Sequence, residues 1–186
     1  MNIINGWIEG IQKITSPNFD KRPTVSTPSL IVIHCISLPP KEFGGEGINQ
    51  LFTNQLVADE HPYYQEIHQL KVSSHLLVRR DGKLIQYVSF LDRAWHAGKS
   101  CYLSQENCND FSIGIELEGC EETPYTTEQY NQLSSVIRLL LANYPTLSPE
   151  HITGHSDIAA GRKTDPGPSF NWDTLRSQLN PPKNQS

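Results

Sequence analysis

The pattern of apolar and polar positions along the chain predicts four strands. Residues 30–36, LIVIHCI, form a short apolar run rich in β-branched side chains, which is typical of a buried strand. Two apolar runs within residues 73–88 flank Asp81 and Gly82. An Asp-Gly pair between two such runs predicts a β-hairpin.

The fourth predicted strand, residues 111–119, has alternating character. Its two faces follow from the two-residue period of a strand: Ile113, Ile115 and Leu117 share one face, and Ser112, Gly114, Glu116 and Glu118 share the other. The second face carries small residues around a carboxylate, which leaves room for a ligand beside Glu116.

A spacing of three to four residues between apolar positions predicts a helix that ends near Asn143 and is capped by Thr126 or Thr127. Its buried stripe consists of Tyr130, Leu133, Ile137, Leu140 and Tyr144. Shorter helices are predicted at residues 48–56, 62–70 and 172–179. Strands and helices do not alternate strictly, so we expect a mixed α/β fold: one domain over residues 1–186, with a central mixed β-sheet flanked by helices. The tail from about 180 to 186 is expected to be loose.

Composition narrows the class of protein. The chain has 186 residues, 37% hydrophobic and 19% charged, which suits one globular domain with a sizeable core. The net charge of −5 and the lack of a basic tract argue against a nucleic-acid partner. No apolar run approaches the roughly 20 residues that span a bilayer, so no membrane partner is expected. The oligomeric state does not follow from these data.

The N-terminal residues favour a cytoplasmic location, and this location bears on the state of the cysteines. Residues 1–17 lack the basic start and continuous apolar core of a signal peptide. The four cysteines form no C-x-x-C pair, and in a reducing compartment they are expected to remain free thiols.

The loop at residues 154–168, GHSDIAAGRKTDPGP, concentrates groups with catalytic potential among Gly and Pro residues. His151 and His155 are four residues apart, but the intervening residues favour a strand, on which they would lie roughly 13 Å apart. At most one of the two can therefore bind a given ion, and His155 is the better candidate because it adjoins the polar loop.

His34 interrupts an apolar strand, so it is either a core histidine satisfied by hydrogen bonds or a ligand at the end of the strand. The Gly- and Pro-rich loop 37–47 follows that strand, and such loops commonly carry binding sites. His34, His155 and Asp165 would make a His₂Asp set with a fourth position open for water, as in catalytic zinc sites. Spacing alone does not establish this set.

Four motifs together resemble the zinc-dependent N-acetylmuramoyl-L-alanine amidases of the amidase-2 family, which is related to peptidoglycan recognition proteins. They are LIVIHCISLPP, AWHAG, CNDFSIGIELEG and GHSDIAAGRKTDPGP. The resemblance covers about residues 5–175 and is strongest for the cytosolic members that cleave 1,6-anhydro-muropeptides. It implies that His34, His155 and Asp165 bind Zn²⁺ and that Glu116 and Lys163 are catalytic.

The implied reaction is hydrolysis of the amide bond between the lactyl group of (1,6-anhydro-)N-acetylmuramic acid and L-alanine, during cytosolic recycling of peptidoglycan. Glu116 would transfer the proton from water to the leaving amine, and Lys163 would stabilise the oxyanion. Without the resemblance, Glu116 could equally be an exposed strand residue, and Lys163 would be better explained as a solvated loop residue.

The resemblance also suggests contacts to this small-molecule substrate. Trp95 and His96 would line the sugar site, although Trp95 could instead pack in the core; Arg162 is either a surface charge or a contact to a substrate carboxylate. Lys71 and Asn107 stand where close family members tend to carry arginine, and Cys35 replaces a common asparagine. These three departures affect recognition of the anionic peptide stem.

Three rival interpretations remain. A binding-only peptidoglycan sensor predicts a missing ligand, and none of the three positions lacks a competent side chain. A different cytosolic zinc hydrolase would be compatible with the same active centre. A structural domain with chance histidines would leave the loop 154–168 unexplained.

Overall fold

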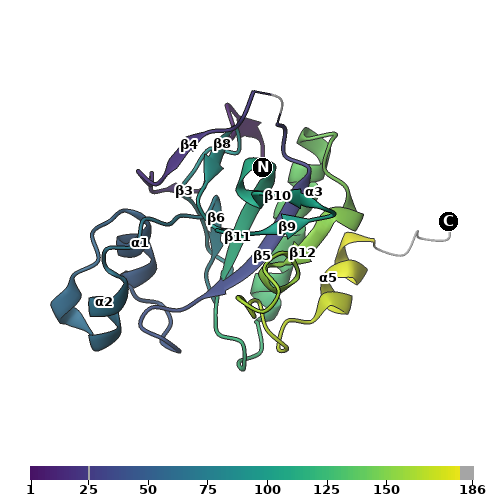
Figure 1. The fold of residues 1–186 in the computed structure, drawn as a ribbon. Helices are drawn as coiled ribbons and strands as arrows, with labels where there is room; N and C mark the ends of the chain where they lie inside the picture. The colour runs from purple at the N-terminus through teal and green to yellow at the C-terminus, as the bar shows by residue number, and fades with distance from the viewer. Residues whose placement is uncertain (25, 181–186) are drawn as a thin grey trace.

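A six-stranded mixed sheet runs through the centre of the molecule (Figure 1). The computed structural model describes residues 1–24 and 26–180, so the predicted loose tail lies, apart from Asn180, outside the described residues. The strands lie in the order β12 (Ile152–Gly154), β5 (Leu30–Ile36), β11 (Ser112–Glu118), β6 (Leu76–Val78), β7 (Leu84–Gln86) and β3 (Gln12–Lys13).

The sheet is parallel at its centre. Strand β5 pairs in parallel with β11 and β12, and β11 pairs in parallel with β6. The predicted hairpin is confirmed, because β6 and β7 are antiparallel and Gly82 between them has a φ of 81°. The last pair, β7 and β3, is parallel again, which makes the sheet mixed as expected.

One face of the sheet is covered by α3 (Thr127–Asn143), against which α5 (Trp172–Leu179) packs. The predicted face of β11 is confirmed: Ile113, Ile115 and Leu117 are buried in the same cluster as the apolar stripe of α3. Each such side chain contributes roughly 1.5–3 kcal/mol when it is fully buried. This layer therefore holds the central strands in place.

Two short helices form a lobe beside the other part of the sheet (Figure 1). They are α1 (Gly47–Phe52) and α2 (Pro62–Ile67), joined by the 3₁₀ turn η1 (Ala58–Glu60). The predicted helices 48–56 and 62–70 were too long at their C-terminal ends. The first ends because Asn54 turns left-handed, with φ 60°, and pairs its side-chain amide with Asn18. After the second, the His68 ring contacts the carbonyls of Tyr64 and Gln65.

Several short elements were not predicted. The two-stranded pairs are β1 (Ile3–Ile4) with β2 (Trp7–Ile8), β4 (Phe19–Lys21) with β8 (Asp92–Ala94), and β9 (Cys101–Tyr102) with β10 (Gln105–Glu106). The one-turn elements are η2 (Cys108–Asp110), η3 (Pro149–His151) and α4 (His155–Ile158). In the described part of the chain, no helix is long and apolar enough to cross a membrane.

The N-terminal cap of α3 is Thr126 rather than Thr127. The Thr126 hydroxyl accepts a hydrogen bond from the Gln129 N–H and donates one to the Arg80 carbonyl. The side-chain oxygen of Gln129 in turn accepts a hydrogen bond from the Thr126 N–H. This is a capping box, and it also ties the helix to the β6–β7 hairpin.

We expect Thr126→Ala to lower the free energy of unfolding by about 1–2 kcal/mol, because a helix N–H loses its partner. Denaturant titration followed by circular dichroism measures this change. The neighbouring exposed Thr127 offers a matched control, since Thr127→Ala should stay within about 0.5 kcal/mol of the wild type. Equal effects of the two substitutions would contradict the assignment of the cap.

Candidate metal centre and active site

Three segments bring the predicted ligands to one edge of the sheet. His34 lies near the C-terminal end of β5, and His155 begins α4 directly after the neighbouring parallel strand β12. Asp165 lies in the loop that follows α4, and its carbonyl accepts a hydrogen bond from the Ser156 N–H at 2.9 Å. This bond folds the loop back onto the start of the helix and brings the Asp165 carboxylate to the histidines.

The three side chains converge on one point. Nδ1 of His34 lies 3.0 Å from Nδ1 of His155, and each of these nitrogens lies 3.1 Å from Oδ2 of Asp165. These three atoms form an almost equilateral triangle. The structure therefore brings together the three predicted ligands, although 121 residues separate the two histidines in sequence.

The triangle has the dimensions of a metal site. Around a tetrahedral zinc ion with bonds of roughly 2.0–2.1 Å, neighbouring ligand atoms lie about 3.3 Å apart. The observed distances of 3.0–3.1 Å are close to this value. The donor set, two imidazoles and one carboxylate, is also one that zinc accepts while leaving a fourth position open. The residues present thus fit a catalytic zinc ion.

Burial and hydrogen bonds together set the charges of His34 and Asp165 in this triangle. Burial lowers the pKa of His34 to about 4, which keeps its ring neutral and able to act as a ligand. Burial alone would raise the pKa of Asp165, but hydrogen bonds to His155 and His34 hold it below its usual range. Asp165 therefore stays ionised beside two imidazoles, as a metal ligand must.

His151, by contrast, is not part of the cluster. It lies in η3, and its Nδ1 contacts the Tyr102 hydroxyl at 3.0 Å. The strand β12 separates it from His155, as the β-favouring residues 152–154 predicted. Of these two histidines, only His155 lies in the cluster with His34 and Asp165.

Glu116 lies directly beside His34, because these two residues are register partners on β11 and β5. Burial, and next to it the charge of Asp165, raise the pKa of Glu116 well above its usual value. Its Oε2 atom is buried and has no hydrogen-bond partner among the described residues. Buried polar atoms are rarely unpaired in folded proteins, and exceptions are common at functional sites.

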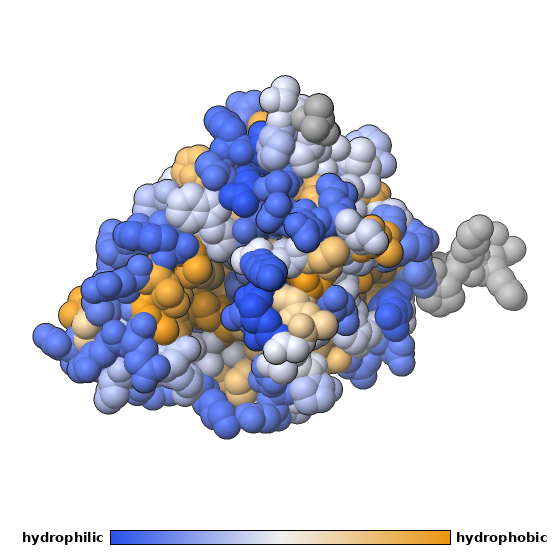
Figure 2. Space-filling model, viewed as in Figure 1, coloured by the Kyte–Doolittle hydropathy of each residue, from blue (hydrophilic) through white to orange (hydrophobic). Residues whose placement is uncertain are grey.

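The triangle and Glu116 line a cleft of about 480 Å³. Lys163 belongs to the same lining but is exposed at the rim. The opposite wall is apolar and comes from α1, α2 and the segment after α2: Leu51, Phe52, Tyr63, Ile67, Leu70 and Val72. Figure 2 shows apolar surface gathered on the lobe of α1 and α2, on the side that faces the recess. This wall was not predicted from the sequence, although the apolar spacing within residues 62–70 was a usable signal.

The predicted substrate contacts are placed unequally around the cleft. Trp95, His96, Cys35 and Arg162 line it. Lys71 is exposed and is not among its lining residues, but its neighbours Leu70 and Val72 are. Asn107 lies in an adjoining depression of about 560 Å³, which shares Arg162 with the cleft. Arg162 donates hydrogen bonds to the carbonyls of Ala97 and Lys99, both at 2.7 Å.

The expectation of open space beside Glu116 was wrong for Gly114. A Cβ atom at position 114 would lie 2.5 Å from Cγ of His96, so the imidazole ring already covers this glycine. The His96 ring is held between two polar partners, with Nδ1 2.8 Å from Nε2 of His34 and Nε2 3.1 Å from the Ser112 hydroxyl. His75, buried beside it, accepts a hydrogen bond from the Gly114 N–H.

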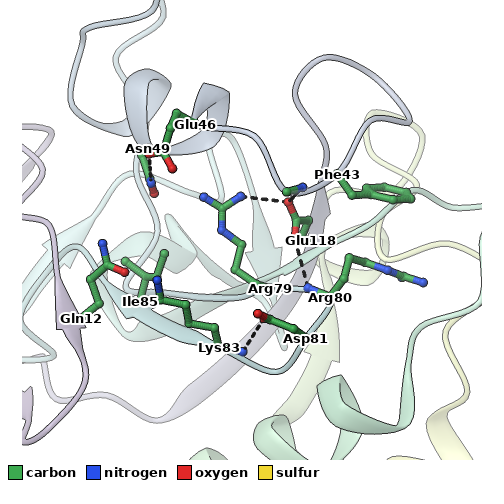
Figure 3. Close-up of a pocket in the computed structure, with 11 residues that line it drawn as sticks. Gln12, Phe43, Glu46, Asn49, Arg79, Arg80, Asp81, Lys83, Ile85 and Glu118 are labelled. Carbon is green, nitrogen blue, oxygen red and sulfur yellow. Dashed lines mark hydrogen bonds and ion pairs between the residues drawn. The ribbon is translucent and has the colours of Figure 1, made fainter.

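A buried ion pair anchors the loop that follows β5. Oε1 of Glu118 accepts hydrogen bonds from Nη1 of Arg79 at 2.9 Å and from the Gly44 N–H at 2.6 Å. Figure 3 shows this carboxylate between the Arg79 guanidinium and the main chain of Arg80, at the side of a second cavity of about 380 Å³. None of the described residues in our predicted site lines this cavity. The Arg79–Glu118 ion pair thus anchors the segment between Ser37 and α1. The first residues of this segment line the cleft.

Comparison with known proteins places the fold and the site in a family. The family model for N-acetylmuramoyl-L-alanine amidase matches residues 24–168. The chain is 53% identical over 172 residues to the 1,6-anhydro-N-acetylmuramyl-L-alanine amidase AmpD of Salmonella typhimurium, covering 92% of this chain and 91% of the relative. A crystal structure of a selenomethionine AmpD derivative superposes with a TM-score of 0.94 at 50% identity, covering 96% of this chain and 99% of the other.

A more distant structure contains a substrate. It is the complex of the Escherichia coli amidase AmiD with anhydro-N-acetylmuramic acid-L-Ala-D-γ-Glu-L-Lys, which matches with a TM-score of 0.60 at 28% identity and covers 85% of this chain and 60% of that one. The family match extends over most of the chain and includes the central-sheet strands β5, β6, β7, β11 and β12, the residues that line the cleft and the His34–His155–Asp165 cluster. The chain therefore belongs to the N-acetylmuramoyl-L-alanine amidase family and is an amidase of that specificity.

Proposed function

We propose that this protein is a zinc-dependent amidase that releases the peptide from 1,6-anhydro-muropeptides in the cytoplasm, as a step in peptidoglycan recycling. The observation that carries this proposal is the triangle of Nδ1 of His34, Nδ1 of His155 and Oδ2 of Asp165, with sides of 3.0–3.1 Å. His34, His155 and Asp165 would hold the ion. All three side chains line the cleft, and Glu116 lines it beside them.

A zinc ion in such a site supplies Lewis-acid activation of a water molecule at neutral pH. Glu116 would accept the proton of that water, because it is the register partner of His34, lines the same cleft and has an Oε2 atom without a partner among the described residues. Burial, which raises the pKa of this carboxyl, also makes it a better proton acceptor. The same group then delivers the proton to the amine of L-alanine as the amide bond breaks.

Lys163 is placed to stabilise negative charge on the substrate oxygen. It stands two residues from Asp165 on the rim of the same cleft, and its ammonium group is exposed rather than paired within the described residues. A cation that meets the oxyanion only as it forms lowers the barrier of the reaction.

The apolar wall and Trp95 suit the muramyl sugar, because an aromatic or aliphatic surface packs against the face of a pyranose ring. The indole N–H of Trp95 is buried and has no partner among the described residues, so a substrate oxygen could accept from it. Cys35 completes the floor beside His34. The peptide stem would leave the cleft past Arg162 towards Asn107, with Lys71 near the other side.

The form of the substrate and the compartment rest on two further points. The relative from Salmonella typhimurium bears the name of a 1,6-anhydro-muramyl amidase, and the AmiD complex contains an anhydro-muramyl peptide. All four cysteines are free in the structure, and Cys101 is exposed, which suits a reducing compartment. An amidase in that compartment would meet soluble wall fragments and not the intact wall.

Purified wild-type protein should contain about one zinc ion per chain, the number expected for a single catalytic site. His155→Ala should lose most of this zinc, because one of three ligands is removed. Elemental analysis after gel filtration measures the content. His151→Ala is the matched control and should retain zinc, since His151 contacts Tyr102 instead. Full zinc content in His155→Ala would rule out the proposed ligand set.

Glu116→Gln should lower kcat by about 10²–10⁴-fold, because the proton acceptor is lost. Lys163→Ala should lower it by about 10²–10³-fold, because the oxyanion loses its cation. Steady-state assays on a muramyl-L-alanine peptide measure both effects, and both variants should keep the wild-type zinc content. Lys13→Ala, which removes an exposed lysine outside the cleft, serves as control. Near-wild-type turnover in either active-site variant would remove that residue from the mechanism.

The substrate preference is tested by supplying soluble 1,6-anhydro-muropeptides and intact sacculi at equal concentrations of the scissile bond. We expect faster peptide release from the soluble fragments, because the cleft would have to reach bonds within a cross-linked mesh in the sacculus. Cell fractionation should recover the protein with cytoplasmic markers. Faster release from sacculi, or recovery with periplasmic markers, would contradict the recycling role and leave the amidase chemistry standing.

A further inference from the structure

The rings of both proposed histidine ligands contact one two-residue segment, His96–Ala97. Nε2 of His155 lies 3.1 Å from the Ala97 carbonyl oxygen, and Nε2 of His34 lies 2.8 Å from Nδ1 of His96. The side chain of one residue and the main chain of the next thus contact the outer nitrogens of both rings. We propose that this segment is a positioning device, in which Nδ1 of His96 accepts a hydrogen bond from Nε2 of His34 and the Ala97 carbonyl accepts one from Nε2 of His155. This inference rests on the proposed zinc site.

The geometry at His155 dictates which nitrogen carries the proton. A carbonyl oxygen can only accept, so Nε2 of a neutral His155 must carry the hydrogen. Nδ1 then presents its lone pair to the point where the three ligand atoms converge. The Ala97 carbonyl therefore selects the tautomer in which His155 can bind a metal.

At His34 the tautomer is selected through a chain of hydrogen bonds that joins Ser112, His96 and His34. The Ser112 hydroxyl lies 3.1 Å from Nε2 of His96, and in the proposed arrangement it accepts a hydrogen bond from this nitrogen. Nδ1 of His96 is then free of hydrogen and accepts from Nε2 of His34. Nδ1 of His34, which lies in the ligand triangle, is left with its lone pair. The opposite order of protons would place a hydrogen on Nδ1 of His34 and block the metal.

Hydrogen bonds to Asn109 hold the main chain of the His96–Ala97 segment in place. Oδ1 of the buried Asn109 accepts hydrogen bonds from the N–H groups of both His96 and Ala97, at 3.1 and 2.8 Å. Gly114 on β11 leaves the space in which the His96 ring lies, since a Cβ there would come within 2.7 Å of Nδ1 and Cδ2. Arg162 adds a donor to the Ala97 carbonyl at 2.7 Å. The ring of His96 is therefore fixed in place and not free to adapt to a sugar.

This arrangement explains the residue that follows Trp95 in the sequence. A histidine chosen to contact a sugar would present its polar ring atoms to the cleft. Here both nitrogens of His96 are engaged within the protein, by His34 and by Ser112. His96 thus acts on the reaction through His34 and not through the substrate.

The test compares zinc affinity in His96→Phe and His96→Asn, measured on the full chain by competition with a chromogenic zinc chelator. Phenylalanine keeps a ring but offers no acceptor, so zinc should bind about 10–100-fold more weakly, as is typical when the outer partner of a ligand histidine is lost. Asparagine places its Oδ1 where Nδ1 of His96 lies and should restore most of the affinity. A merely space-filling role would predict the opposite order.

Two further measurements separate positioning from other roles. At saturating zinc, His96→Phe should change kcat more than KM for a muramyl-L-alanine peptide, whereas a sugar contact would raise KM. In the zinc-loaded wild type, ¹⁵N NMR of the histidine side chains should show hydrogen on Nε2 of both His34 and His155. Circular dichroism of each variant before zinc is added checks that the fold is kept.

The outcomes are distinct. Wild-type zinc affinity in His96→Phe, with a raised KM, overturns the positioning role and leaves the zinc amidase standing. Hydrogen on Nδ1 of His34 in the loaded protein also overturns it. A wild-type chain that binds no zinc overturns the proposed function, and this inference with it.

Discussion

The parallel pairing of β5 with β11 is the constraint on which the site depends. Its register sets His34 opposite Glu116, so the proposed metal ligand and the proposed proton acceptor lie side by side on one face of the sheet. On the other face, the same two strands present isoleucines and a leucine to α3. A shift of one residue in either strand would turn its polar residue into that apolar layer and its apolar residues into the cleft. The same strand register is thus required both for packing against α3 and for assembly of the site.

The cost of burying polar groups is met by an ordered network beneath the cleft. His34, His96 and His155 contact one another or a fixed partner, and Ser112, Asn109 and the Ala97 carbonyl supply the outer partners. An unpaired polar group in such a place would cost about 1–3 kcal/mol. Two groups in the lining of the cleft are exceptions, because Oε2 of Glu116 and the indole N–H of Trp95 have no partner among the described residues. These are the groups that we assign to the reaction and to the substrate.

The cleft joins two kinds of surface that come from different parts of the chain. The sheet edge and the loop 154–168 supply charge and ligands, and the lobe of α1 and α2 supplies an apolar wall (Figure 2). The Arg79–Glu118 ion pair anchors the start of that wall through Gly44 and Gly45. A sugar with a charged peptide suits such a cleft, since one part of the ligand is broad and weakly polar and the other is ionic.

The sequence by itself determined the main strands, the hairpin, the long helix and the chemical type of the three ligands. These features depend on local periodicity, on turn residues such as Asp81 and Gly82, and on motifs within single segments. Tertiary structure alone decided that His34 and His155, 121 residues apart, would meet Asp165 at 3.1 Å, and that Thr126 rather than Thr127 would cap α3. Tertiary structure also decided that His96 contacts His34 and that Arg162 donates hydrogen bonds to main-chain carbonyls. The physical reason is that partners and tautomers depend on strand register and loop closure, which join residues that no local pattern relates.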